Sequence, residues 1–215
     1  MLSAKLSVSA LLFCALFACT SSQASEETSS TESTSVDTAH LERAVFAGGC
    51  FWCMEGPFEK LKGVGAVLSG YSGGKKETAN YKLVSAGSTK HAEVIEVLYD
   101  PKLVSYEKLL ETFWHNIDPL AKDSQFCDSG TQYRSAIFFK DAEEQKQAEA
   151  SKQKLEQNSK FSGKIATQIV SLDAFYPAEE YHQDYYKKNP IRYGMYRKGC
   201  GRDARLEELW GKSGH

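Results

Sequence analysis

The first 39 residues differ in composition from everything that follows, and they limit the folded domain to the rest of the chain. Residues 6–18 form an apolar run behind Lys5, while residues 20–38 contain twelve Ser or Thr, four acidic side chains and no aromatic one. Such a polar segment buries too little apolar surface to offset its conformational entropy on folding. We therefore expect a signal peptide at 1–18, a disordered tether at 19–39 and one folded domain at 40–215.

The end of the apolar run predicts export. Leu16-Phe17-Ala18-Cys19 resembles a bacterial lipoprotein box, in which cleavage before the cysteine leaves Cys19 as the lipid attachment point. Ser22-Gln23-Ala24 offers an alternative cleavage site that would give a soluble exported form. The run is too short to span a bilayer comfortably. We expect a periplasmic protein or a membrane-anchored lipoprotein of a bacterium.

Charge is close to balanced, with 26 Lys and Arg against 28 Asp and Glu. The chain therefore lacks the positive field that broad nucleic-acid binding requires, and nucleic acid is not an expected partner. No heptad pattern indicates self-association, so we expect a monomer.

Apolar spacing predicts strands that alternate with helices, which is typical of an α/β (α+β) two-layer sandwich with a mixed sheet and a ferredoxin-like βαβ core. Beyond residue 172 the chain is tyrosine-rich, and an irregular tail packed over the core is expected there; closure of its tyrosines over a pocket is the alternative. Strands are predicted at 43–47, 64–71, 91–99, 133–139 and 165–172, and helices at 50–61, 105–117 and 141–159.

Four of the six cysteines matter to the domain, because Cys14 and Cys19 precede it: Cys50, Cys53, Cys127 and Cys200. Cys50 follows Gly48-Gly49 at a predicted junction between a strand and a helix. Backbone amides at a helix N-terminus favour an anion, and the thiolate is the nucleophilic form of cysteine. Cys50 is therefore the strongest candidate for a reactive thiol.

Six ordered blocks between residues 43 and 193 closely resemble the A type of peptide methionine sulfoxide reductase. They are Gly49-Cys50-Phe51-Trp52, Gly70-Tyr71-Ser72-Gly73-Gly74, His91-Ala92-Glu93-Val94, Tyr99-Asp100-Pro101, Gly130-Thr131-Gln132-Tyr133-Arg134-Ser135 and Tyr181-His182-Gln183-Asp184-Tyr185. The resemblance implies reduction of the S epimer of methionine sulfoxide, free or in proteins, through a cysteine sulfenic acid. It implies recycling by a thioredoxin-like reductant, and neither a cofactor nor a metal.

The resemblance also implies roles for individual residues. Cys50 matches the nucleophile and Glu93 the acid that protonates the sulfoxide oxygen, a task that suits a partly buried carboxyl group with a raised pKa. Alternation along 91–99 places Glu93 on one strand face with Ile95 and Val97. Tyr81 and Tyr133 match the phenols that bind the sulfoxide oxygen, Asp128 matches a carboxylate that orders the site through water, and Phe51 and Trp52 match the aromatic cup for the substrate methyl group.

The thiol that resolves the sulfenic acid is left open by the sequence. Gly194 occupies the position that we align with the family's usual resolving cysteine, and Cys53 stands where the family more often has glycine. The candidates, in order of preference, are Cys200 in a glycine-flanked tail, Cys53 in a C-x-x-C motif and Cys127 beside Asp128.

Two other functions can be weighed against the reductase. A thioredoxin-like disulfide oxidoreductase would use Cys50 and Cys53, but it would need a downstream cis-proline, and no proline lies between Pro57 and Pro101. A zinc-binding module would need paired cysteine motifs, whereas Cys127 and Cys200 stand alone.

Overall fold

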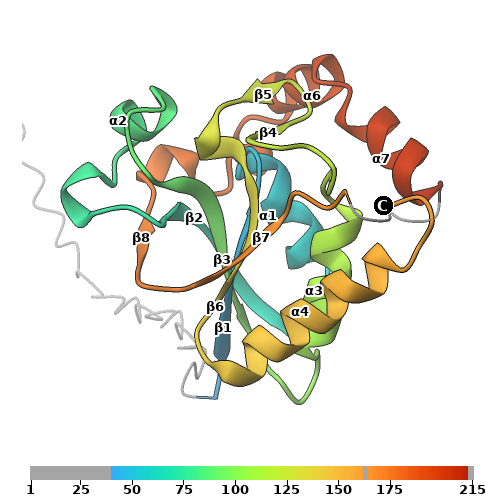
Figure 1. Cartoon of the computed structure of the whole chain (residues 1–215). Coiled ribbons are helices and arrows are strands. Elements are labelled where there is room, and N and C mark those ends of the chain that lie inside the picture. Colours follow the sequence, from blue (N-terminus) through green and yellow to red (C-terminus); the bar gives the residue numbers. More distant parts are fainter. Residues whose placement is uncertain (1–39, 162–163, 213–215) are drawn as a thin grey trace, which may run out of the picture. The chain divides into compact units, whose positions relative to one another are not determined.

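The computed structural model describes residues 40–161 and 164–212 of the 215-residue chain (Figure 1). The predicted signal peptide at 1–18, the tether at 19–39 and Cys19 lie outside these residues. Across the described ranges, every helix is too short or too polar to cross a membrane.

A six-stranded mixed sheet forms the centre of the domain, in the order β7-β6-β1-β3-β2-β8. Neighbouring strands are antiparallel except β6 and β7, which are parallel. The inner order β6-β1-β3-β2 is that of a ferredoxin-like split βαβ core, so the predicted fold class is confirmed. The strands are β1 Glu42–Gly48, β2 Val64–Ser72, β3 Ala92–Tyr99, β6 Ser135–Phe139, β7 Gln168–Ser171 and β8 Phe175–Pro177.

Three helices form the second layer: α1 Trp52–Glu59, α3 Tyr106–His115 and α4 Ala142–Glu156. Two of them begin within one residue of the predicted starts at 105 and 141, because Ser105 and Asp141 accept backbone N–H groups of the first turn of α3 and α4. Phe46 of β1 stacks at 5.3 Å on Phe58 of α1 and at 5.3 Å on Phe113 of α3. This apolar layer fixes α1, and with it the segment before α1, against the central strand.

The sheet is strongly curled. β7 and β8 are its two edges, yet only residues 172–174 join them. Four Cα–Cα steps span at most about 14 Å, whereas the edges of a flat six-stranded sheet would be about 24 Å apart. Figure 1 shows this orange segment crossing the sheet. Leu172 and Phe175 thereby pack with Val94 and Phe138 on the face opposite the helices.

Short elements interrupt the two long connections of the core. Residues before β3 form the 3₁₀ helix η1 Lys76–Thr78 and the helix α2 Tyr81–Ser85. The predicted loop at 118–132 contains a hairpin of β4 Ser124–Gln125 and β5 Asp128–Ser129, followed by the 3₁₀ helix η2 Thr131–Tyr133. Cys127 therefore lies at a hairpin tip, directly before Asp128.

The prediction of an irregular C-terminal tail is wrong, since most of residues 180–210 is helical. The elements are η3 Glu180–His182, α5 Tyr185–Lys188, α6 Pro190–Gly199 and α7 Arg202–Trp210. α6 gives no apolar stripe that predicts a helix: it contains Gly194 and Gly199, and its aliphatic residues Ile191 and Met195 are 81% and 73% exposed. Specific contacts to the site, described below, hold it in place instead.

Candidate active site

Cys50 lies between the end of β1 and the start of α1, as the sequence predicts. Its carbonyl accepts the N–H of Cys53 at 3.0 Å and so begins the first turn. Gly49 before it has φ +82°, and a Cβ there would meet the Cβ of Gln125 at 2.5 Å. Only glycine fits this close approach. The Cys50 side chain is 6% exposed.

Cys50 and Cys53 are free thiols that share a hydrogen bond. Burial raises the pKa of Cys50 well above its ordinary value. The pKa of Cys53 is lowered to about 6: the hydrogen bond from Cys50 is the largest cause, the charges of Arg202 and Arg197 add to it, and burial acts in the opposite direction. At neutral pH the pair thus holds one proton between two sulfur atoms, so that Cys53 can accept the proton that Cys50 loses.

Glu93 of β3 is buried beside these thiols. It shares a sheet face with Ile95 and Val97, which confirms the alternation read from the sequence. Its carboxylate accepts the backbone N–H of Phe51 at 3.2 Å. Burial raises the pKa of Glu93 to about 8, with smaller contributions from Asp128 and Cys53. Glu93 is therefore a proton donor at neutral pH.

Tyr81 and Tyr133 come from separate elements and meet at the same site. Tyr81 begins α2 and Tyr133 ends η2. Burial raises the pKa of both phenols, and the charges of Glu93 and Cys50 raise them further. Both side chains therefore keep their protons and can donate hydrogen bonds to an oxygen atom above Cys50.

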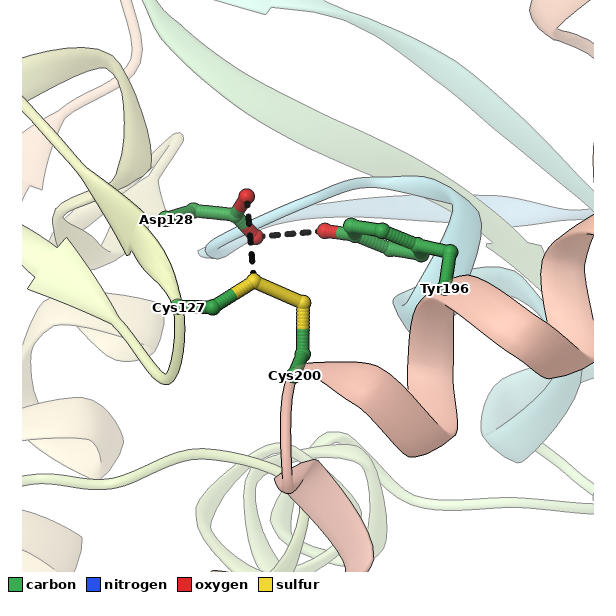
Figure 2. Close-up of a disulfide and its surroundings, with 4 residues drawn as sticks. All are labelled: Cys127, Asp128, Tyr196 and Cys200. Carbon is green, nitrogen blue, oxygen red and sulfur yellow. Dashed lines mark hydrogen bonds between the residues drawn. A yellow bond between two sulfur atoms is a disulfide. The ribbon is translucent and has the colours of Figure 1, made fainter.

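Asp128 accepts a hydrogen bond from Tyr196 of α6, with Oη and Oδ2 2.5 Å apart. Figure 2 shows the neighbouring disulfide between Cys127 and Cys200, which joins the β4–β5 hairpin to the end of α6. The Sγ of Cys127 lies 3.8 Å from Asp128 Oδ1. Tyr196 also lies close enough to the Cys50 thiol to lower its pKa slightly against the larger effect of burial. The tail therefore reaches the nucleophile.

Phe51 and Trp52 differ in their surroundings. Phe51 is 1% exposed and contacts His182, with ring centroids 4.9 Å apart. Trp52 stacks on Tyr185 at 3.8 Å and meets the edge of Tyr196 at 5.9 Å. Of the two residues predicted to form the aromatic cup, Trp52 is partly exposed and Phe51 is buried beneath the site surface.

His182 and Glu179 belong to the site although the sequence gave them no role. The indole N–H of Trp52 donates to Nδ1 of His182 at 3.1 Å, and burial lowers the pKa of His182 to about 4. Glu179 accepts the Tyr71 hydroxyl at 2.8 Å and the backbone N–H of Tyr81 at 2.9 Å. The Tyr181-His182-Gln183-Asp184 block was the signal that pointed to this region.

Tyr196 and Arg202 are also site residues that the sequence did not identify. In the sequence Tyr196 is only one tyrosine of an aromatic tail. The tail packs over the core, as expected, through the buried side chains of Tyr185, Leu206 and Leu209, and Tyr196 in addition contacts Asp128. Arg202 donates to the carbonyl of Gly48, two residues before Cys50, at 3.2 Å.

Comparisons with known proteins agree with this geometry. A family model described as peptide methionine sulfoxide reductase matches residues 42–214. The reductase MsrA of Halalkalibacterium halodurans is 49% identical over 172 residues, which cover 80% of this chain and 98% of that protein.

Two solved structures are also similar. Reduced Mxr1 from Saccharomyces cerevisiae has a TM-score of 0.67 at 36% identity, covering 72% of this chain and 89% of that one. Methionine sulfoxide reductase A of Corynebacterium diphtheriae has a TM-score of 0.65 at 33% identity, covering 71% and 76%.

The chain belongs to the peptide methionine sulfoxide reductase family, with the A-type enzymes as its relatives. It is an oxidoreductase that reduces methionine sulfoxide with thiols, and this assignment replaces the thioredoxin-like and zinc-binding alternatives.

Proposed function

We propose that Cys50 attacks the sulfur of methionine S-sulfoxide, free or in oxidised proteins, and that this chain repairs exported proteins. Attack by the Cys50 thiolate, with a proton delivered to the sulfoxide oxygen, releases methionine and leaves Cys50 as a sulfenic acid. The observation that carries this proposal is the buried carboxyl of Glu93, which is hydrogen-bonded to the backbone of Phe51 next to the nucleophile and whose pKa burial raises to about 8.

Glu93 supplies the proton. An attacking thiolate pushes negative charge onto the sulfoxide oxygen, and a carboxyl group with a pKa near the working pH transfers a proton efficiently. Tyr81 and Tyr133 donate hydrogen bonds to the same sulfoxide oxygen. Asp128 orders the site around that oxygen through water. Trp52 and Phe51 receive the methyl group, with favourable contact between sulfur and aromatic rings.

Cys53 resolves the sulfenic acid in our proposal, in place of Cys200, which ranked first from the sequence. The Cys53 sulfur is already hydrogen-bonded to Cys50, and its lowered pKa favours the attacking thiolate. The sulfurs of Cys127 and Cys200 are bonded to each other in this structure. Attack of Cys53 on the sulfenic acid forms the Cys50–Cys53 disulfide and releases water, and a thioredoxin-like dithiol then reduces that disulfide.

Export is the second part of the proposal. Its support is the apolar run at 6–18, the Leu16-Phe17-Ala18-Cys19 box and the alternative site after Ala24. Lipid on Cys19 would attach the enzyme to a membrane, whereas cleavage after Ala24 would give a soluble periplasmic form. Fractionation of cells that express the full chain and its Cys19→Ala variant separates these cases: loss of the membrane-bound form in the variant supports lipidation, and no change contradicts it.

Peptide mapping under non-reducing conditions tests the chemistry. Enzyme with free Cys50 and Cys53 is mixed with one equivalent of methionine S-sulfoxide, without reductant, and its disulfides are identified by mass spectrometry. We expect one methionine per enzyme and a new Cys50–Cys53 disulfide. A bond from Cys50 to Cys200 or Cys127 would contradict the role given to Cys53, and the absence of methionine would contradict the activity.

A further inference from the structure

Arg202, the first residue of α7, is a buried cation without an ion pair. Its side chain is 2% exposed, and its Nε is buried without a hydrogen-bond partner. Across residues 40–161 and 164–212 no carboxylate forms a salt bridge with Arg202: Asp203 pairs with Arg197, Asp118 pairs with Arg205, and the charge of Arg202 acts on Asp128 only over a longer distance. Burial of an unpaired charge is costly. Such a group in a stable fold calls for a nearby negative charge that is not a surface carboxylate.

The contacts of Arg202 reach the segments that carry the reactive thiols. Nη2 donates to the carbonyl of Asn116 at 2.6 Å and to that of Gly48 at 3.2 Å, and it lies 3.0 Å from Met54 Sδ. Gly48 is two residues before Cys50, and Met54 directly follows Cys53. The guanidinium therefore holds both ends of the Cys50-Phe51-Trp52-Cys53 turn.

Arg202 also lies beneath the hairpin of Asp128. Its guanidinium carbon is 4.4 Å from the centre of the Phe126 ring, one residue before Cys127. The cation thus contacts the nucleophile turn and the hairpin that faces it, and it favours negative charge on both Cys53 and Asp128.

We propose that Arg202 is a positioning residue of the reductase: it fixes the Cys50–Cys53 turn through Gly48 and supplies the positive charge that stabilises the anion shared by the two thiols. The inference rests on the proposed attack by a Cys50 thiolate. It explains why a full positive charge is buried at this point, because the thiol pair, together with Asp128, supplies compensating negative charge.

Other charged and titratable groups face the thiol pair, and the test has to separate them. These groups come from five elements: Glu93 from β3, Asp128 from β5, Tyr81 from α2, Tyr133 from η2, and Tyr193, Tyr196 and Arg197 from α6. Arg197 is engaged by Asp203 and by the Tyr193 hydroxyl. Arg202 is therefore the arginine near the thiols that no salt bridge engages, and its charge acts on Cys53 and Asp128.

The test follows the thiolate absorbance of the full enzyme as a function of pH, with the Cys127–Cys200 disulfide intact and no sulfoxide present. Arg202→Gln keeps a donor for the Gly48 carbonyl but removes the charge, and we expect about a tenfold smaller thiolate fraction at neutral pH. Arg202→Lys keeps the charge, and its thiolate fraction should stay close to that of the wild type.

Arg205→Gln is the matched control, because Arg205 lies on the same helix and anchors it to Asp118 without facing the thiols. Its thiolate titration should coincide with that of the wild type. Repeating the series in the Glu93→Gln background removes the charge of Glu93 from the comparison. A thiolate titration of Arg202→Gln that matches the wild type would overturn the proposal.

The wild-type enzyme gives a second test in case Arg202→Gln does not fold. The thiol pair should lose its first proton below the pKa of about 8.5 of a free cysteine, and a first midpoint at or above that value would overturn the proposal. Because no sulfoxide is used, this result is independent of whether the enzyme reduces methionine sulfoxide.

Discussion

The Tyr196 hydroxyl donates to Asp128 Oδ2 at 2.5 Å while the ring of Tyr196 meets Trp52 edge-on at 5.9 Å. Asp128 and Trp52 are two of the residues assigned to the substrate. A side chain of α6 therefore covers this part of the candidate site, where Cys50 is 6% exposed.

Removal of this cover should expose the nucleophile. Tyr196→Ala is expected to raise the rate of Cys50 alkylation severalfold, because the phenol no longer lies against the sulfur. Ile191→Ala is the matched control, since Ile191 lies on α6 but is 81% exposed. Peptide-resolved mass spectrometry measures the rate, and equal rates in the two variants would show that Tyr196 does not shield Cys50.

Substitution of Cys50 and substitution of Cys53 should block different steps of the reaction. Cys50→Ser is expected to lose all reduction of methionine S-sulfoxide, even with dithiothreitol, because no thiolate attacks the sulfur. Cys53→Ser should still form one methionine per enzyme and then stop when thioredoxin is the reductant. A Cys53→Ser enzyme that turns over normally with thioredoxin would be inconsistent with the resolving role.

Glu93→Gln should slow formation of the sulfenic acid by about 10²- to 10⁴-fold, the usual range for a positioned general acid. The wild-type rate of this step should also decrease as the pH rises through about 8, where Glu93 loses its proton. Single-turnover release of methionine measures both effects. An unchanged rate in the variant would remove Glu93 from the mechanism.

The carboxyl group of Glu93 should also make the free energy of unfolding depend on pH. The pKa of Glu93 is about 8 in the folded protein against 4.5 for an unperturbed glutamate, so the native state binds more protons between these values. The free energy of unfolding should therefore decrease as the pH rises from about 4.5 to 8, and Glu93→Gln should flatten this dependence. Urea midpoints across that range measure it, and parallel curves for the two proteins would refute the assignment.

The Trp52–His182 hydrogen bond should survive moderate acid. Nδ1 of His182 accepts the indole N–H, and burial keeps the pKa of His182 near 4, below the ordinary 6.5. Stability from this depressed pKa is present above 6.5 and is lost as the pH falls toward 4. Trp52 emission should therefore change only near pH 4, and the change should be absent in Trp52→Phe. A transition near 6.5 would contradict the buried neutral histidine.

Local signals account for the parts of the fold and site that the sequence predicted. Ser105 and Asp141 cap helices through contacts within four residues, and alternation in β3 places Glu93 by a rule of period two. The family resemblance located Tyr133 within one of its blocks, and Tyr81 and Asp128 by their positions between blocks. These features depend on neighbours in the chain or on recognisable motifs.

The parts that were not predicted depend on contacts between distant segments. α6 buries no side chain of its own and is held by Tyr196 on Asp128 and by Cys200 on Cys127, 68 and 73 residues away in the sequence. Arg202 reads as an ordinary surface cation until the fold places it under Gly48. The residue pattern of the tail alone does not indicate which distant residues Tyr196, Cys200 and Arg202 contact.

The Cys127–Cys200 bond turns the stretch from the tip of the β4–β5 hairpin to the end of α6 into a covalent ring. Closing a loop with a sequence separation of 73 removes chain entropy from the unfolded state worth about 4 kcal/mol on the loop-closure account. A cycle that makes and breaks only the short Cys50–Cys53 bridge leaves this constraint in place at every turnover. A single protease cut between residues 128 and 199 would accordingly leave two fragments still joined, whereas the same cut would release the tail of an unbridged chain.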